Sequence, residues 1–90
     1  MVSRGVIRHA NFDDTVSRLA ESLPSLPAVI DGLLWTLAKK PDLGVYNQRV
    51  GVWQARFWAS DNSPEFLLFY TFGPRLLFAL TVVPARQGDP

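Results

Sequence analysis

The sequence predicts an α+β fold in which a helix hairpin packs on one face of a small antiparallel sheet, with the element order β-α-α-β-β-β. Two stretches of helical periodicity occupy the first half of the chain, and three stretches of strand character with short turns between them follow. The chain has 90 residues, the size of one domain. We therefore expect a single domain, residues 1–90, whose last three strands form a meander.

The first half is predicted to contain a weak strand and then a helix. Residues 2–8 are a short strand with little apolar content. Asn11 is a good N-cap for the first helix, and the adjacent carboxylates Asp13 and Asp14 suit its first turn, where the helix dipole favours negative charge. Apolar residues then recur at helical spacing until Pro24 stops the helix.

A second helix is predicted to open at residues 25–27, since proline is tolerated in a first turn. Its apolar stripe includes Ile30, Leu34 and Leu37, and Pro41 ends it. Only a few residues join the two helices, so they are expected to form an antiparallel hairpin.

The strongest strand signal lies in residues 65–83, where two aromatic and branched runs flank Gly73-Pro74. A third strand is predicted at residues 52–58. Alternate residues in a strand face opposite sides, and both faces of the 65–83 hairpin are apolar, with Leu76, Phe78, Leu80 and Val82 sharing one of them. The helix hairpin can cover one face of the sheet. The other face is expected to carry a groove or to be buried by another chain, a homodimer included.

Composition excludes several classes of function. The chain has no cysteine and one histidine, so thiolate chemistry, disulfides and multi-histidine metal sites are excluded, and we expect no metal and no cofactor. A net charge of +1 implies no strong overall field. No apolar run is long enough to span a bilayer, and the first ten residues lack the features of a signal peptide. We expect a cytoplasmic protein with no membrane partner.

Four motifs suggest a family. They are the helix end of residues 37–42, the Val-Trp-Gln-Ala-Arg strand of residues 52–56, the Leu-Leu-Phe-Tyr strand of residues 67–70, and the closing strand of residues 76–83 with Arg86 after it. In these motifs the sequence resembles the RelE/ParE superfamily of toxins from bacterial type II toxin–antitoxin systems. The resemblance implies a toxin that cuts ribosome-bound mRNA without a metal or inhibits DNA gyrase, and that a cognate antitoxin neutralises.

The resemblance also implies site residues. Arg56 and Arg86 occupy the basic positions to which ribonuclease members assign catalytic arginines. Leu67 falls where those members carry another arginine, and the chain ends before their C-terminal tyrosine or histidine. These departures weaken the prediction of RNA cleavage and shift weight to a ParE-like or non-cleaving member.

Further candidates follow from side-chain chemistry. Arginine binds phosphate through bidentate contacts, so Arg49 and Arg75 are candidate RNA-binding residues, against the alternative of solvated surface arginines. Trp53, Trp58 and Tyr70 are candidate partner-binding residues, although packing within the protein is the favoured interpretation of Tyr70. His9 is interpreted as a surface histidine.

Two hypotheses of function remain open. The first is the toxin with its antitoxin. The second is a non-catalytic interaction domain of the same fold, whose open apolar sheet binds a partner or a second copy. Leu67→Arg discriminates between them, because it restores an arginine that cleavage by this fold would require.

Overall fold

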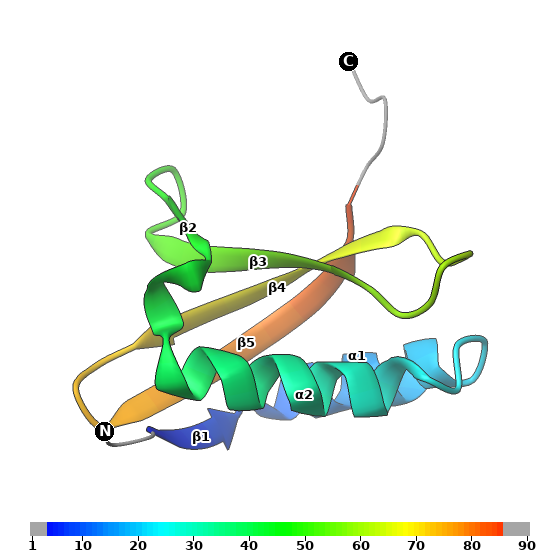
Figure 1. Cartoon of the computed structure of the whole chain (residues 1–90), viewed down its shortest axis with the longest axis horizontal. Helices are drawn as coiled ribbons and strands as arrows, with labels where there is room; N and C mark the ends of the chain where they lie inside the picture. Colours follow the sequence, from blue (N-terminus) through cyan, green and yellow to red (C-terminus); the bar gives the residue numbers. More distant parts are fainter. Residues whose placement is uncertain (1–3, 86–90) are drawn as a thin grey trace.

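A five-stranded mixed sheet forms one layer of the protein and two helices form the other (Figure 1). The computed structural model describes residues 4–85. In chain order its elements are β1 (Gly5–Arg8), α1 (Ala10–Ala20), α2 (Leu26–Lys39), the 3₁₀ helix η1 (Pro41–Leu43), β2 (Val45–Asn47), β3 (Val52–Trp58), β4 (Glu65–Phe72) and β5 (Leu76–Pro84). The predicted α+β class, with a helix pair against a sheet, is confirmed.

The sheet differs from the prediction in two ways. Its strand order is β1-β5-β4-β3-β2, and β1 runs parallel to β5, so the sheet is mixed rather than antiparallel. A tight turn between two strands forces them to pair antiparallel. No such turn joins β1 to β5, because the helix pair and the other strands lie between them in the chain, so parallel pairing is possible. The segment between α2 and β3, in which no strand was predicted, also contains β2, which pairs with the start of β3.

The alternation predicted along β5 is wrong beyond Ala79. The register between β4 and β5 shifts at Phe69 and Tyr70, leaving Leu80 without a partner across the ladder. This bulge inserts one residue, so Leu77, Ala79 and Val82 are the buried residues of β5. The predicted set that joined Leu76 and Phe78 to Val82 on one face is therefore divided between two faces.

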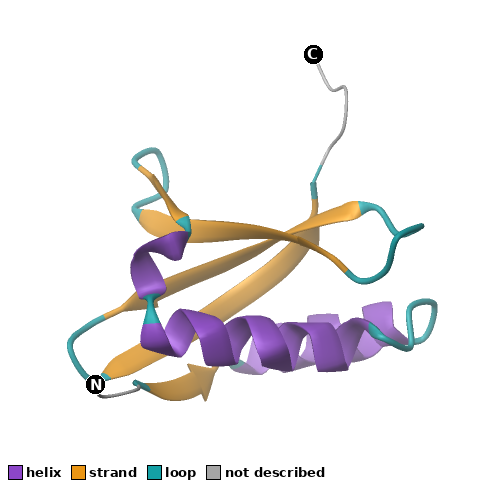
Figure 2. Ribbon diagram, in the orientation of Figure 1, coloured by secondary structure: helices purple, strands orange, loops and turns teal. Residues whose placement is uncertain are grey.

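Both helices cover the same face of the sheet (Figure 2). The helical side of the core is made by Phe12 and Val16 of α1 and by Leu26, Ile30, Leu34 and Leu37 of α2. These side chains meet the buried residues of the strands, which are Ala55, Phe57, Phe66, Leu68, Tyr70, Leu77, Ala79 and Val82. No element within residues 4–85 covers the opposite face, as the sequence predicted.

The N-terminus of α1 is capped by a residue other than the predicted one. His9 is the N-cap, and its Nδ1 accepts a hydrogen bond of 3.2 Å from the backbone N–H of Asn11. His9 is exposed, as the sequence indicated, and in addition it has a structural role as the N-cap. Arg8 bonds to Asp31 of α2 and lies 3.7 Å from Asp13 of α1, so the end of β1 is tied to both helices.

A buried tyrosine holds the connection after α2 to the sheet. The Tyr70 hydroxyl donates a hydrogen bond to the carbonyl of Pro41 and accepts one of 3.1 Å from the N–H of Gly44. Burial raises the pKa of Tyr70 above its ordinary value of 10.0; the Asp42 carboxylate raises it further, and the hydrogen bond from Gly44 lowers it. The neutral phenol is thus the form that the fold selects.

This pKa shift predicts a loss of stability in alkali. The unfolded tyrosine loses its proton near pH 10, whereas the folded one keeps it to higher pH, so its contribution is complete below about pH 10 and is lost as the pH rises through the folded pKa. Tyr70→Phe should cost about 1–3 kcal/mol at pH 7. In urea unfolding at pH 7 and pH 11, the stability difference between the wild type and Tyr70→Phe should shrink at pH 11. An unchanged difference would contradict the assignment.

Candidate protein-binding face

The face of the sheet that points away from the helices, which we call the open face, is largely apolar. Leu67 and Phe69 of β4 and Phe78 and Val83 of β5 alternate with buried core residues, so they lie on this side, and each is half-buried. A half-buried apolar sheet without a second layer is an exposed apolar patch, a feature that marks interaction sites.

Arg56 of β3 stands on the open face beside a buried carboxylate. Its Nε lies 3.8 Å from Glu65 Oε2, and the side chain of Arg56 is 69% exposed whereas that of Glu65 is 7% exposed. Burying a carboxylate is costly unless it has partners, so the guanidinium compensates part of that cost. Because Arg56 is mostly exposed, its remaining N–H groups stay available to a ligand.

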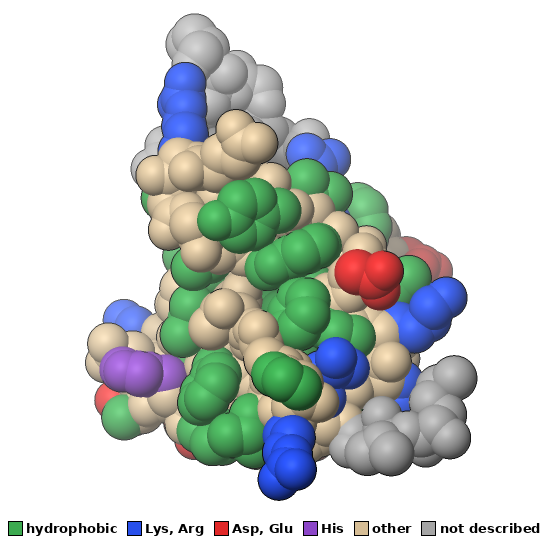
Figure 3. Space-filling model, turned by 90° about the vertical axis from the view of Figure 1, so that its left-hand side faces the viewer, with side chains coloured by type: hydrophobic (Ala, Val, Ile, Leu, Met, Phe, Trp, Pro, Cys, Tyr) green, Lys and Arg blue, Asp and Glu red, His purple; other side chains and the backbone are tan. Residues whose placement is uncertain are grey.

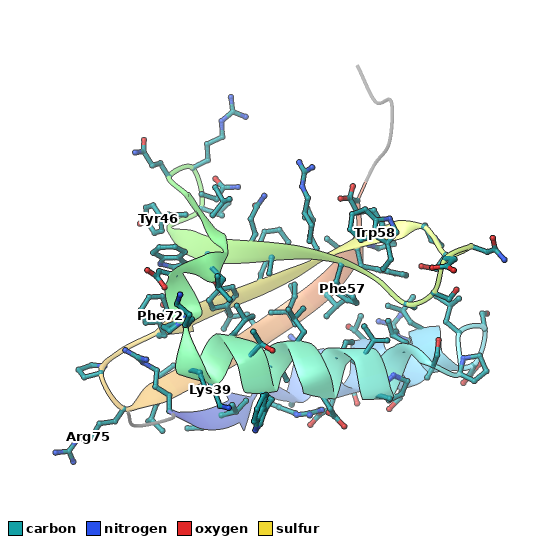
Figure 4. The ribbon with its side chains drawn as sticks, viewed as in Figure 1. Lys39, Tyr46, Phe57, Trp58, Phe72 and Arg75 are labelled. Atoms are coloured by element: carbon teal, nitrogen blue, oxygen red, sulfur yellow. The ribbon has the colours of Figure 1, made fainter. Side chains whose placement is uncertain are left out.

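Trp58 extends the open face toward the end of β3. It is 54% exposed, and in Figure 4 it points away from the helices while its neighbour Phe57 points toward them. Arg56 and Trp58 are two residues apart on one strand, so they share a face. Arginine and tryptophan are the types most enriched among residues that dominate binding energy at protein interfaces.

A hollow adjoins the same strand on the other side of Arg56. A hollow of about 530 Å³ lies between α2 and β3 and is lined by Leu33, Leu37, Leu43, Gly44, Val45, Gln54, Ala55 and Arg56. β2 pairs with only the first three residues of β3, so residues 55–58 have no strand neighbour at this edge within the described chain. Arg56 therefore borders both the hollow and the open face.

The predicted cations are not gathered into one site. Arg49 lies in the turn between β2 and β3, and Arg75 lies in the turn between β4 and β5, where Figure 4 shows it at the margin of the molecule. Arg56 is four residues into β3, and Arg86 falls outside the described residues. Within residues 4–85, the open face brings together one guanidinium, Arg56, and one carboxylate, Glu65.

The three predicted partner-binding residues occupy different environments. Trp58 is exposed on the open face. Trp53 lies on the helix side of the sheet, half-buried, with its ring centroid 5.3 Å from that of Phe72. Tyr70 is fully buried with its hydroxyl bonded to the backbone, which is the packing role that the sequence favoured.

Two residues of the sheet, Glu65 and Tyr46, received no role from the sequence. Glu65 is a charged residue at the first position of an otherwise apolar strand. This one charged residue was the only sign in the sequence that a carboxylate is buried beside Arg56. Tyr46 lay outside every predicted element, yet it belongs to β2 and is 48% exposed. Both depend on strand pairing that residue types alone do not reveal.

A scan against models of protein families finds no match, and a search of curated proteins finds none either. In residues 4–85, no cluster of histidine, aspartate and glutamate is suited to hold a metal ion. No helix in that part of the chain is both long and apolar enough to cross a membrane.

Proposed function

We propose that the protein is the toxin of a bacterial type II toxin–antitoxin pair, of RelE/ParE type, and that a cognate antitoxin neutralises it in the cytoplasm. Its target would be the ribosome with bound mRNA, or DNA gyrase. The proposal is supported by the four motifs of the sequence and by the order of elements, in which a helix pair follows a first strand and precedes an antiparallel meander that contains the three predicted strands.

The observation that carries the proposal is the open face. Four half-buried apolar side chains on β4 and β5 lie beside the exposed Arg56 and Trp58 of β3. An apolar centre with aromatic and arginine anchors has the composition of a protein interface core. Such a surface fits a macromolecular partner better than a small substrate, and an antitoxin that wraps over the toxin would bury it.

The proposed mode of action is binding rather than cleavage. Metal-free RNA cleavage needs a base for the 2′-hydroxyl, an acid for the leaving oxygen and cations for the phosphorane. On the open face, Leu67 lies directly across the ladder from Arg56, and Arg56 is paired with Glu65. On the described part of the open face, a single ion pair does not supply the base, the acid and the cations together. Inhibition of the target by binding is therefore the better supported mechanism.

A non-catalytic interaction domain is the second candidate. The pairing of Arg56 with Glu65, together with the placement of Arg49 and Arg75 in separate turns, favours it over a ribonuclease. This domain would bind its partner, or a second copy, through the same open face without blocking growth.

Induced expression in bacteria tests the proposal. Wild-type protein should stop growth, with a fall in labelled amino-acid incorporation if the ribosome is the target, or in labelled thymidine incorporation if gyrase is. Loss of an interface anchor typically weakens binding by at least about 30-fold, so Trp58→Ala should relieve the inhibition. Trp35→Ala is the matched control, because Trp35 is 63% exposed on α2, in the other layer.

The outcomes separate the candidates. Growth unaffected by the wild type would reject the toxin and leave the interaction domain. Cleaved mRNA in wild-type cells would reject action by binding alone. If the wild type does not cleave mRNA and the fold lacks the other catalytic groups, Leu67→Arg should not cleave mRNA either. Cleavage by Leu67→Arg would show that the arginine at this position was the one catalytic group that was missing. A test of the role of Arg56 in binding should use Arg56→Lys, because this variant keeps a positive charge beside the buried carboxylate of Glu65.

A further inference from the structure

The edge of the sheet at β3 carries a short stretch of backbone without a strand neighbour. β2 pairs only with the first three residues of β3, so residues 55–58, which we call the free edge, have no partner strand on this side within the described chain (Figure 1). A Cβ on Gly44 would lie 2.6 Å from the carbonyl oxygen of Gln54, so that carbonyl points outward, toward β2. Backbone groups alternate in direction along a strand, so the N–H and C=O groups of Arg56 and Trp58 also point outward.

A hollow lies beside the free edge where a further strand would have to fit. It is the hollow of about 530 Å³ between α2 and β3. Its wall at the end of β2 is apolar and exposed, because it includes Leu43 and Val45. Figure 3 views the molecule from the end that carries β2 and η1, and hydrophobic side chains cover the middle of that end. A strand added along the free edge therefore has both room and apolar surroundings.

The free edge is exposed on one side of the sheet and buried on the other. Arg56 and Trp58 are exposed on the side away from the helices, whereas Ala55 and Phe57 are buried on the helix side. Charged side chains on an edge strand usually prevent it from pairing with another strand. Arg56 is the charged residue of this edge, so pairing requires a group opposite it that attracts a cation.

We propose that two copies of the protein pair through their free edges, antiparallel and about a twofold axis at Phe57. In this register Arg56 of each copy lies opposite Trp58 of the other, and the outward backbone groups of these two residues form four hydrogen bonds across the axis. Residues directly opposite in a sheet share a face, so each guanidinium meets the indole ring of the other copy in a cation–π contact. The two sheets join into one continuous sheet.

The place where β3 ends favours a second copy as the occupant. A strand that runs along the free edge must stop opposite Arg56, because β2 occupies the edge from Gln54 onward. β3 itself ends at Trp58, and the chain turns away through residues 59–62. With Trp58 opposite Arg56, each copy's strand therefore ends where the other copy's β2 begins. The net charge of +1 adds little repulsion between two copies.

The dimer goes beyond the proposed function and does not rest on it. Its contacts come from the edge of β3, whereas the apolar centre of the open face is on β4 and β5. The open faces of the two copies would lie side by side on the same side of the joined sheet, so both would stay accessible to a partner.

Sedimentation equilibrium of the purified protein from about 1 µM to about 1 mM tests the proposal. An interface of two short strands belongs to the small and weak class, so we expect a dimer with a Kd of about 1–100 µM. Trp58→Lys should weaken association about tenfold or more, because it places like charges opposite each other at two sites. Position 58 lies across from Glu65 in its own sheet, so a lysine is compatible with the fold. Trp35→Lys, at a 63% exposed position of α2, is the matched control and should change the Kd by less than about twofold.

Cysteine cross-linking tests the register, because the chain has no cysteine of its own. Opposite residues of a hydrogen-bonded antiparallel pair have Cα atoms about 5.5 Å apart, a separation that a disulfide spans. On oxidation, a mixture of Arg56→Cys and Trp58→Cys should therefore form a covalent dimer. Neither variant alone should do so, because its two cysteines would be two residues apart along the paired strands, about 8 Å between Cα atoms.

Three results would overturn the proposal. A monomer at every concentration would exclude the dimer. Equal effects of Trp58→Lys and Trp35→Lys, or cross-linking of the single cysteine variants as readily as of the mixture, would place any interface elsewhere, the open face included. The unfolding midpoint of each variant shows whether a loss of association reflects a loss of fold. These measurements use purified protein and growth inhibition is measured in cells, so this proposal and the proposed function can fail separately.

Discussion

Gly44→Ala is expected to destabilise the protein by about 3 kcal/mol, a large fraction of the stability of a small domain. A Cβ at residue 44 would clash with the Tyr70 hydroxyl and would lie 2.6 Å from the carbonyl oxygen of Gln54. Tyr70 is fully buried and Gln54 belongs to β3, so neither can move aside without disturbing the sheet. Relief of the clash would also break the hydrogen bond from Gly44 to Tyr70.

Urea unfolding followed by circular dichroism measures this effect. Gly32→Ala is the matched control, because nothing lies within 4 Å of a Cβ at that exposed helical position. There alanine should stabilise the protein by about 0.5–1 kcal/mol through its helix propensity. Equal midpoints for Gly44→Ala and the wild type would show that the backbone of residues 41–44 is not held against Tyr70 as described.

Phe12→Ala is expected to cost about 3–5 kcal/mol, the range for a fully buried phenylalanine. Phe12 is 0% exposed, and with Val16 it makes the buried part of α1. Removal of its ring would leave a cavity between α1 and the sheet, and the short helix has little stability of its own in water. The loss approaches the lower end of the stability expected of a domain of this size, about 5–13 kcal/mol.

Phe12→Leu separates the loss of apolar burial from damage to the helix. It keeps most of the buried volume and should cost less than about half as much as Phe12→Ala in the same unfolding experiment. Ser17→Ala, at an exposed position of α1, should change the unfolding free energy by less than about 0.5 kcal/mol. A cost for Phe12→Ala below about 1 kcal/mol would mean that α1 is not anchored to the sheet by this ring.

Much of the fold was predictable because hydrophobic periodicity is local. The stripe of Ile30, Leu34 and Leu37 fixes the buried side of α2, and alternation along β3 fixes Arg56 and Trp58 on one face. Two amphipathic helices supply one covering layer, so the sequence already predicted that one face of the sheet would stay uncovered.

The parts of the site that sequence reasoning missed depend on contacts between distant residues. Arg56 meets Glu65 because β3 and β4 pair in a particular register, and no local pattern reports that register. Arg4 contacts Phe72, which lies 68 positions later in the chain, because β5 returns to pair with β1.

By itself, the sequence determined the helices with their buried sides and the three long strands, because these follow from the periods of 3.6 and 2 along the chain. Only the tertiary structure decided the parallel pairing of β1, the bulge at Leu80 and the capping by His9. It also decided which side chains the arginines meet: Arg56 lies beside a buried carboxylate, and Arg4 lies over the ring of Phe72. The physical reason is that pairing and side-chain packing are set by the competition among all elements for the same core, and that competition is settled only when the chain has folded.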